Sequence, residues 1–222
     1  MDHFLALSNF QLIAFSAVEN FLLLFMTLYL SKKHLGKMSF SDKVTIGSTY
    51  LGNIIITFLG LWILKTGSIK LRYELSLFEL ILHLVLLLIA LDVVMYLLHR
   101  IAHQPVIYKY IHQHHHKQIK THPAVLFILH PLENLAFGSL LVVACFFFNL
   151  NFYALSIYLI VNYLFGIMGH LEREPFINSI NHNVFFKIFT SQTFHANHHL
   201  HETSNFGFYF KLWDKVLKTY RN

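Results

Sequence analysis

The residues best suited to chemistry in this sequence are its histidines, which number 17 against one cysteine. Eight of them form one HxxxH pair followed by two HxxHH patterns. Residues three and four apart lie on one face of a helix, so their imidazoles can bind the same ion. The spacing therefore predicts a metal site with nitrogen ligands. The eight residues are His99, His103, His112, His115, His116, His195, His198 and His199.

The number and type of these side chains restrict the metal. One zinc or iron ion takes about four to six ligands, so eight imidazoles imply two ions. Imidazole suits iron, zinc, copper and nickel, whereas hard cations prefer oxygen and structural zinc usually recruits cysteine. The only cysteine, Cys145, lies in an apolar run. Two redox-active irons at a membrane surface would indicate oxygen activation, but ligand type alone leaves iron, zinc, copper and nickel open.

The HxxxH pair ends a long apolar segment that predicts a helix limited by Pro105. Four residues on it are spaced 0, 4, 7 and 11, which at about 100° per residue gives one stripe about 60° wide. They are Asp92, Tyr96, His99 and His103. An acid within a span is costly, so Asp92 is expected either to orient a ligand histidine or to pair with a neighbouring helix. On the next segment His114 faces away from the other histidines and is expected at the surface.

The chain is 55% hydrophobic, which is high for a soluble domain. Residues 10–30, 45–65 and 77–100 are each long enough to span a bilayer, which needs about 20 residues. Residues 134–150 and 151–170 are shorter and predict a helical hairpin. We expect an all-α integral membrane protein with four to five transmembrane helices, namely three spans plus a hairpin, and a histidine-rich helical cap.

We expect a single membrane domain over residues 1–222. Residues 1–76 would form the N-terminal spans and residues 77–222 the histidine-box core. Glu19 and Asn20 lie within the first span and are expected to make helix–helix contacts.

The basic residues predict which end of the spans faces the cytoplasm. Of 17 Lys and Arg residues, 14 fall in the segments that contain the histidines or join the first two spans, and 3 fall on the opposite side. By the positive-inside rule the N-terminus lies outside and the histidine site is cytoplasmic. The formal charge of +6 does not indicate nucleic-acid binding, because no basic face stands apart from the apolar spans.

An ordered set of sequence blocks runs from Asp92 to Tyr220. The blocks are "DVVMYLLHRIAH", "YKYIHQHHH", "HPLEN", "GHLEREPF" and "FHANHHLHETSNFGFYFKLWD". Together they resemble the fatty acid hydroxylase/sterol desaturase superfamily of membrane-bound histidine-box di-iron oxygenases. Acyl-lipid desaturases share the histidine boxes, but the "HPLEN" and "SNFG…LWD" blocks do not belong to their pattern.

The resemblance implies that the eight histidines bind two iron ions (Fe2+/Fe3+), with dioxygen as co-substrate. It adds His170, His130 and His182 as further candidate ligands. Residues expected to support the ligands are Asp92, Tyr96, Glu133 and Asn205. No separate catalytic acid or nucleophile is predicted. Some members carry HxxxH before the last box where this chain has Gly166 and His170, so one ligand is expected to be missing or supplied elsewhere.

The implied function is that of an oxidoreductase in lipid biosynthesis, which hydroxylates or desaturates a C–H bond of a membrane lipid, with hydroxylation favoured. Electrons would come from a separate donor, a b-type cytochrome or a ferredoxin with its reductase. A bacterial inner membrane is the favoured location and the endoplasmic reticulum the second. Two other interpretations stay open: a metal-binding or transport membrane protein, and a catalytically degenerate family member. The substrate class stays open too.

Overall fold

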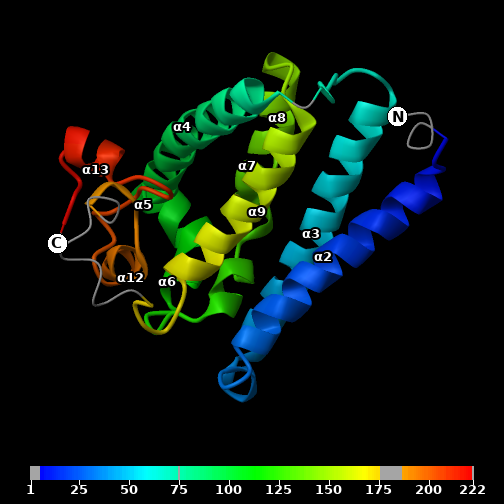
Figure 1. Ribbon diagram of the computed structural model, residues 1–222. Coiled ribbons are helices and arrows are strands. Elements are labelled where there is room, and N and C mark those ends of the chain that lie inside the picture. Colours follow the sequence, from blue (N-terminus) through cyan, green and yellow to red (C-terminus); the bar gives the residue numbers. More distant parts are fainter. Residues whose placement is uncertain (1–5, 75, 176–186, 222) are drawn as a thin grey trace.

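The computed structural model describes residues 6–74, 76–175 and 187–221. Regular structure in these ranges is entirely helical, apart from two isolated β-bridges (Figure 1). The helices in chain order are α2 (Asn9–Leu30), η1 (Leu35–Lys37), α3 (Phe40–Lys65), α4 (Leu77–Ala102), α5 (Pro105–Ile107), η2 (Tyr108–His112), α6 (Gln113–His116), η3 (Pro123–Phe127), α7 (Pro131–Gly138), α8 (Leu140–Phe147), α9 (Phe152–Gly169), α12 (Gln192–Leu200) and α13 (Leu212–Val216).

Four of these helices are long and apolar enough to cross a membrane: α2, α3, α4 and α9, with 22, 26, 26 and 18 residues. The predicted all-α membrane fold with four to five spans is therefore confirmed. The predicted hairpin divides unequally, because α9 qualifies as a span while α7 and α8 are short and meet at Ser139. Polar caps explain where several spans begin, since Ser8, Ser39 and Asn151 each accept a backbone N–H of the first turn.

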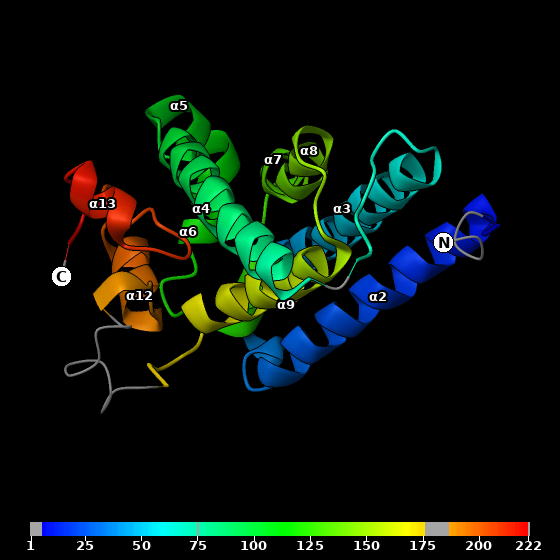
Figure 2. The same cartoon turned by 45° about the horizontal axis from the view of Figure 1, so that its top comes forward.

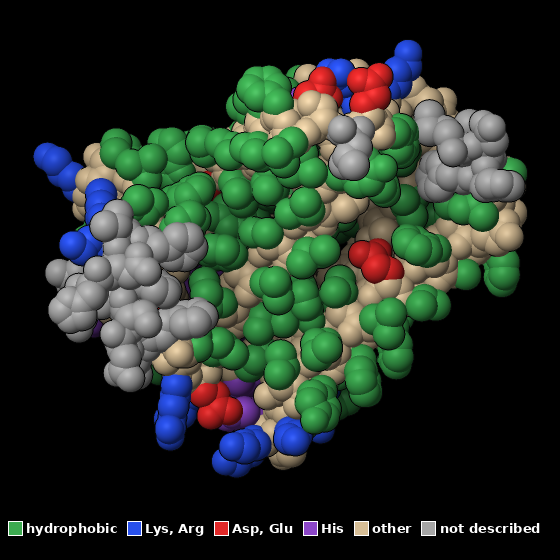
Figure 3. Space-filling model, viewed as in Figure 1, with side chains coloured by type: hydrophobic (Ala, Val, Ile, Leu, Met, Phe, Trp, Pro, Cys, Tyr) green, Lys and Arg blue, Asp and Glu red, His purple; other side chains and the backbone are tan. Residues whose placement is uncertain are grey.

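The surface of the spans is apolar. Large hydrophobic side chains are exposed along α2, α3 and α4, as at Phe10, which is 79% exposed, and Phe40, which is 83% exposed. Hydrophobic side chains fill the middle of the face in Figure 3, while most Lys and Arg side chains lie at its edges. A soluble monomer rarely exposes so large an apolar area, so lipid is the expected neighbour of these helices.

The spans pack as two pairs: α2 lies antiparallel to α3, whereas α4 and α9 run parallel, both ending at the histidines (Figures 1 and 2). Polar contacts join them: Asn20 Nδ2 donates to Thr57 Oγ1 at 3.1 Å, as expected for Asn20, and Thr27 Oγ1 lies 2.8 Å from Tyr163 OH. The segment η3 is buried against α2 and α3, and Ser31 Oγ accepts the Ala124 N–H at 2.8 Å. These contacts place η3, α6 and α12 beside the same end of the bundle.

Candidate metal centre

Nine histidines converge at that end of the bundle as two adjacent groups, and within each group the ligand atoms lie within 4.8 Å of one another. The first histidine group contains His99, His103, His112, His116 and His198. The second histidine group contains His115, His170, His195 and His199. All eight histidines predicted from the spacing belong to one group or the other, and the further candidate His170 joins the second.

The two groups share helices, so each HxxHH pattern contributes to both. His112 and His116 enter the first group from η2 and α6, while His115 between them enters the second. On α12, His195 and His199 belong to the second group and His198 to the first. The π-helical stretch Tyr108–His112 departs from regular α-helical spacing just before these histidines. Such irregular turns are frequent at functional sites.

The nitrogen atoms that face one another are close. Nε2 of His112 lies 3.1 Å from Nε2 of His116, and Nε2 of His195 lies 3.1 Å from Nε2 of His170 and 3.2 Å from Nε2 of His199. Nine imidazoles exceed the coordination of one ion, which takes about four to six ligands. The donor set therefore fits two ions, one in each histidine group.

The opposite ring nitrogens are held by partners outside the groups. Nδ1 of His99 lies 3.0 Å from the Phe206 carbonyl, and Nδ1 of His198 lies 2.7 Å from the Ser204 carbonyl. Further carbonyl partners are Ile128 for His115, at 3.2 Å, and Gly166 for His170, at 2.8 Å. A ring that donates its Nδ1–H to a carbonyl leaves Nε2 as a free lone pair, which is the arrangement of metal-binding histidines.

Buried nitrogens without partners give a second sign that the residues fit a metal. Nε2 of His103 and His198, and Nδ1 of His116 and His199, are buried with no hydrogen-bond partner among the described residues. A buried polar atom left unpaired is costly. Ligation through Nε2 would satisfy this atom in His103 and His198, so the residues present fit the two ions that their number implies.

The protein holds these histidines in their neutral, ligating form. Burial, with a smaller effect of neighbouring histidines, lowers the pKa of His116 to about 3 and that of His170 to about 4. The pKa of His115, His195 and His198 is held well below the ordinary value of 6.5 for the same reasons. Protonated imidazole cannot bind a metal, so this environment keeps the lone pairs available at neutral pH.

Among the residues expected to support the ligands, Glu133 contacts a histidine directly: its Oε1 lies 2.6 Å from Nδ1 of His112, and both side chains are buried. Asp92 instead accepts the backbone N–H of Tyr209 at 2.7 Å, and Tyr96 OH lies 2.9 Å from Thr219 Oγ1. Asn205 accepts the Arg221 N–H and donates to the Phe194 carbonyl. The last three thus hold the C-terminal segment around the site.

Of the two other candidate ligands, His130 belongs to neither group. His130 is the N-cap of α7 and accepts the Leu132 N–H through Nδ1, at 3.2 Å. His182 lies outside the described residues.

At Gly166, a Cβ atom would come within 2.8 Å of the Leu126 side chain, so a larger residue there would displace Leu126. Among the described residues the second histidine group contains four histidines, with His170 at the end of α9.

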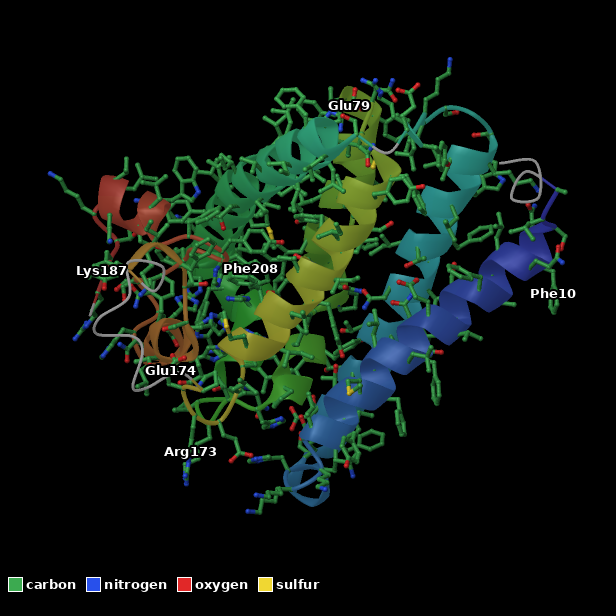
Figure 4. The ribbon with its side chains drawn as sticks, viewed as in Figure 1. Phe10, Glu79, Arg173, Glu174, Lys187 and Phe208 are labelled. Carbon is green, nitrogen blue, oxygen red and sulfur yellow. The ribbon has the colours of Figure 1, made fainter. Side chains whose placement is uncertain are left out.

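A cavity of about 570 Å3 adjoins both histidine groups. Histidines of each group line it, together with apolar side chains from α2, α3, α4, α7 and α9. Phe208, which lines this cavity, lies between α4 and α9 in Figure 4. Sequence spacing gave no sign of this cavity, because its walls come from helices far apart in the chain. Glu19 also lines the cavity, whereas the sequence had suggested a helix–helix contact for this residue.

The model of the family described as fatty acid hydroxylase matches residues 84–219, which contain all nine clustered histidines. The chain belongs to the fatty acid hydroxylase family. This confirms the resemblance drawn from the histidine blocks. The helices α2 and α3 lie outside the matched residues, so the family match does not cover their contribution to the cavity.

Several curated proteins are similar to this family member. It is 30% identical to a Delta(7)-sterol 5(6)-desaturase of Leptosphaeria maculans over 130 residues, 59% of the chain and 34% of the relative. It is 28% identical to lathosterol oxidase of Homo sapiens, over 68% of the chain and 49% of the relative. It is 30% identical to methylsterol monooxygenase 1 of Gallus gallus, over 56% of the chain and 41% of the relative. The chain thus spans about a third to a half of their lengths. No solved structure matches it.

Proposed function

We propose that this protein is a membrane di-iron oxidoreductase that uses dioxygen and external electrons to hydroxylate, or alternatively to desaturate, a C–H bond of a lipid. The observation that carries the proposal is the joining of two neutral histidine groups to a cavity between membrane helices. A lipid can enter such a cavity from the bilayer, and the histidines stand at one end of it. The related sterol desaturases and methylsterol monooxygenase support the reaction type.

The two ions would be held by the first and second histidine groups. Iron bound there supplies redox chemistry with dioxygen that no side chain in the site can supply. The protein's own residues hold the ring protons on Nδ1 of His99, His115, His170 and His198, where backbone carbonyls accept them. Glu133 does the same for His112. These contacts fix which nitrogen faces inward.

The apolar walls of the cavity orient the lipid and exclude water. Met95, Phe137 and Phe206 line it near the first histidine group and offer no polar atom that competes with the histidines. Hydroxylation consumes one dioxygen, two electrons and two protons and forms the alcohol and water. The electrons would come from a separate b-type cytochrome, or from a ferredoxin with its reductase. The chain would act as a single domain, in which residues 1–76 form the N-terminal spans and residues 77–222 form the histidine-box core.

Metal content decides between this proposal and the alternatives. Protein grown on iron-57 and purified in detergent is expected to carry about two irons per chain, because each histidine group supplies enough ligands for one ion. Mössbauer spectra should show the irons as a coupled pair. The double variant His198→Ala/His199→Ala removes one ligand from each group and should lose most of the iron. His201→Ala is the matched control, since His201 is exposed and belongs to neither group.

Zinc alone, or protein without metal after iron-replete growth, would contradict the oxygenase proposal. Iron that stays bound without lipid turnover, when a reducing donor is supplied, would favour a catalytically degenerate member. A transport function would instead require a continuous path of metal ligands through the spans, whereas the nine clustered histidines gather at one end of the bundle.

A further inference from the structure

Two polar residues lie in the middle of the first helix pair. Glu19 is near the centre of α2 (Asn9–Leu30), and Asn53 is near the centre of α3 (Phe40–Lys65). At 1.5 Å per residue, each is about 15 Å or more from both ends of its helix. This places them at the depth of the hydrocarbon core, where a carboxyl or carboxamide group is expensive unless it has a partner.

Neighbouring polar side chains on these helices have partners, but these two have none among the described residues. Asn20 is bonded to Thr57, and Thr49 Oγ1 donates to the Leu129 carbonyl at 3.2 Å. No hydrogen bond or ion pair within the described part of the chain involves the side chain of Glu19 or Asn53. Neither residue therefore serves the contact between α2 and α3, which Asn20 and Thr57 already make.

Both residues line the same cavity as the histidines. Its volume of about 570 Å3 is within the range of small-molecule sites, which is about 300–1,000 Å3. No Lys or Arg is among its described lining residues, so the protein itself supplies no counter-charge for Glu19 there. The cavity therefore has an unpaired polar region at mid-depth, apolar walls and histidines at the end of the bundle beside η3.

We propose that Glu19 and Asn53 form a polar subsite that binds the hydroxyl group of an alcohol-type lipid while the histidine site oxidises a remote carbon. This proposal rests on the proposed function. The lipid hydroxyl donates its hydrogen to a Glu19 carboxyl oxygen, and Asn53 Nδ2–H donates to the hydroxyl oxygen. Both residues of the subsite lie in the part of the chain that precedes the family match.

The depth of the subsite favours a hydroxyl group over a charged group. Hydrogen bonds can offset the cost of transferring an uncharged hydroxyl into an apolar medium, whereas a charged group costs far more to transfer. The distance also has a consequence for the product. Along α2, Glu19 is about 16 Å from Leu30, the end beside η3 and the histidines, at 1.5 Å per residue. The oxidised carbon therefore lies well away from the hydroxyl.

The test measures binding of three radiolabelled probes to the full chain in nanodiscs: a long-chain primary alcohol and the alkane and primary amine of equal length. The alcohol should bind more tightly than the alkane. Glu19→Leu and Asn53→Leu should each weaken alcohol binding about tenfold, since each removes one buried hydrogen bond. Glu19→Gln keeps a hydrogen-bonding group and should bind the alcohol as the unaltered chain does. Ser48→Ala, on α3 but away from the cavity lining, is the matched control.

Equal binding of alcohol and alkane would overturn the subsite, as would an amine preference that Glu19→Gln abolishes. Iron content is measured on the same samples, which separates the two proposals. A chain that carries two irons but shows no alcohol preference keeps the proposed function and loses the subsite. A chain that prefers the alcohol through Glu19 but binds no iron keeps the subsite and loses the proposed function.

Discussion

The partner of one imidazole nitrogen decides what the other can do. In both histidine groups, carbonyls or a carboxylate hold Nδ1 of several rings, so Nε2 faces the site. Glu133 differs from the carbonyl partners because it brings a carboxylate against His112 in a buried place. A carboxylate raises the basicity of a ligating imidazole and fixes its orientation. This single contact therefore affects how strongly the first histidine group binds metal.

Replacing Glu133 should weaken the first ion selectively. Glu133→Gln keeps the shape but replaces the carboxyl group with a carboxamide, and the affinity for one of the two ions should fall about 10- to 100-fold, the usual effect of such a contact. Competition with a chelator on detergent-purified protein measures it. Glu74→Gln serves as control, because Glu74 is exposed and its side chain is near Arg72 only. An unchanged affinity would mean that Glu133 does not act through His112.

The eight spaced histidines were predictable at the residue scale, but their division between two groups was not. The rule for residues three and four apart places His112, His115 and His116 on one face, whereas His115 belongs to the other group. Both HxxHH patterns divide in the same way, with the first and last histidine in one group and the middle one in the other, although only the first pattern follows a π-helical turn. The partner of Asp92 was equally hidden, because Tyr209 is 117 residues away and only the fold brings it near.

At the scale of elements, the C-terminal segment over residues 206–214, which we call the bracket, holds backbone groups of the site in place. Asp214 accepts the Phe206 N–H at 2.9 Å and the Gly207 N–H at 2.7 Å. This holds the Phe206 carbonyl against His99. The close approach leaves no room at Gly207, where a Cβ would meet the Phe210 oxygen at 2.4 Å and Asp214 Oδ2 at 2.9 Å. The glycine is thus required by packing.

Gly207→Ala should therefore disturb the bracket and the metal site together. Forcing a methyl group into a filled space costs about 1–3 kcal/mol of folding stability. Thermal unfolding in detergent should show a lower midpoint, and iron content should fall because His99 loses its fixed partner. Gly47→Ala is a matched control, since a Cβ there meets nothing within 4 Å. Equal unfolding midpoints for the two variants would contradict this account of Gly207.

Helix positions were largely predictable because apolar length and polar caps are local signals. The first and third predicted spans, 10–30 and 77–100, agree with α2 and α4 within two residues, while α3 begins five residues before the predicted 45 because Ser39 and Asp42 form a capping box. The arrangement of α7 and α8 was not predicted, although the break falls at Gly138–Ser139 and Gly/Ser pairs are frequent sites of helix kinks. The cavity requires all these helices at once, so local signals could not reveal it.

At the scale of the whole molecule, charge and hydrophobicity are separated along the bundle. The apolar spans lie between two polar ends, and Arg173 points away from the helices at the end that carries the histidines (Figure 4). The opposite end has fewer basic residues, including Lys70, which is exposed. Basic residues are retained on the cytoplasmic side during insertion, so this asymmetry predicts a cytoplasmic histidine site.

Labelling from outside the cell tests this orientation. In a Cys145→Ala background, which removes the native thiol, Lys70→Cys should react with a membrane-impermeant maleimide on intact spheroplasts, because its loop faces outward. Lys37 is the last residue of η1, at the histidine end, and is exposed, so Lys37→Cys should react only after the membrane is permeabilised. Both variants replace an exposed lysine and so serve as controls for each other. The reverse pattern would place the histidines outside and would require an electron donor on that side instead.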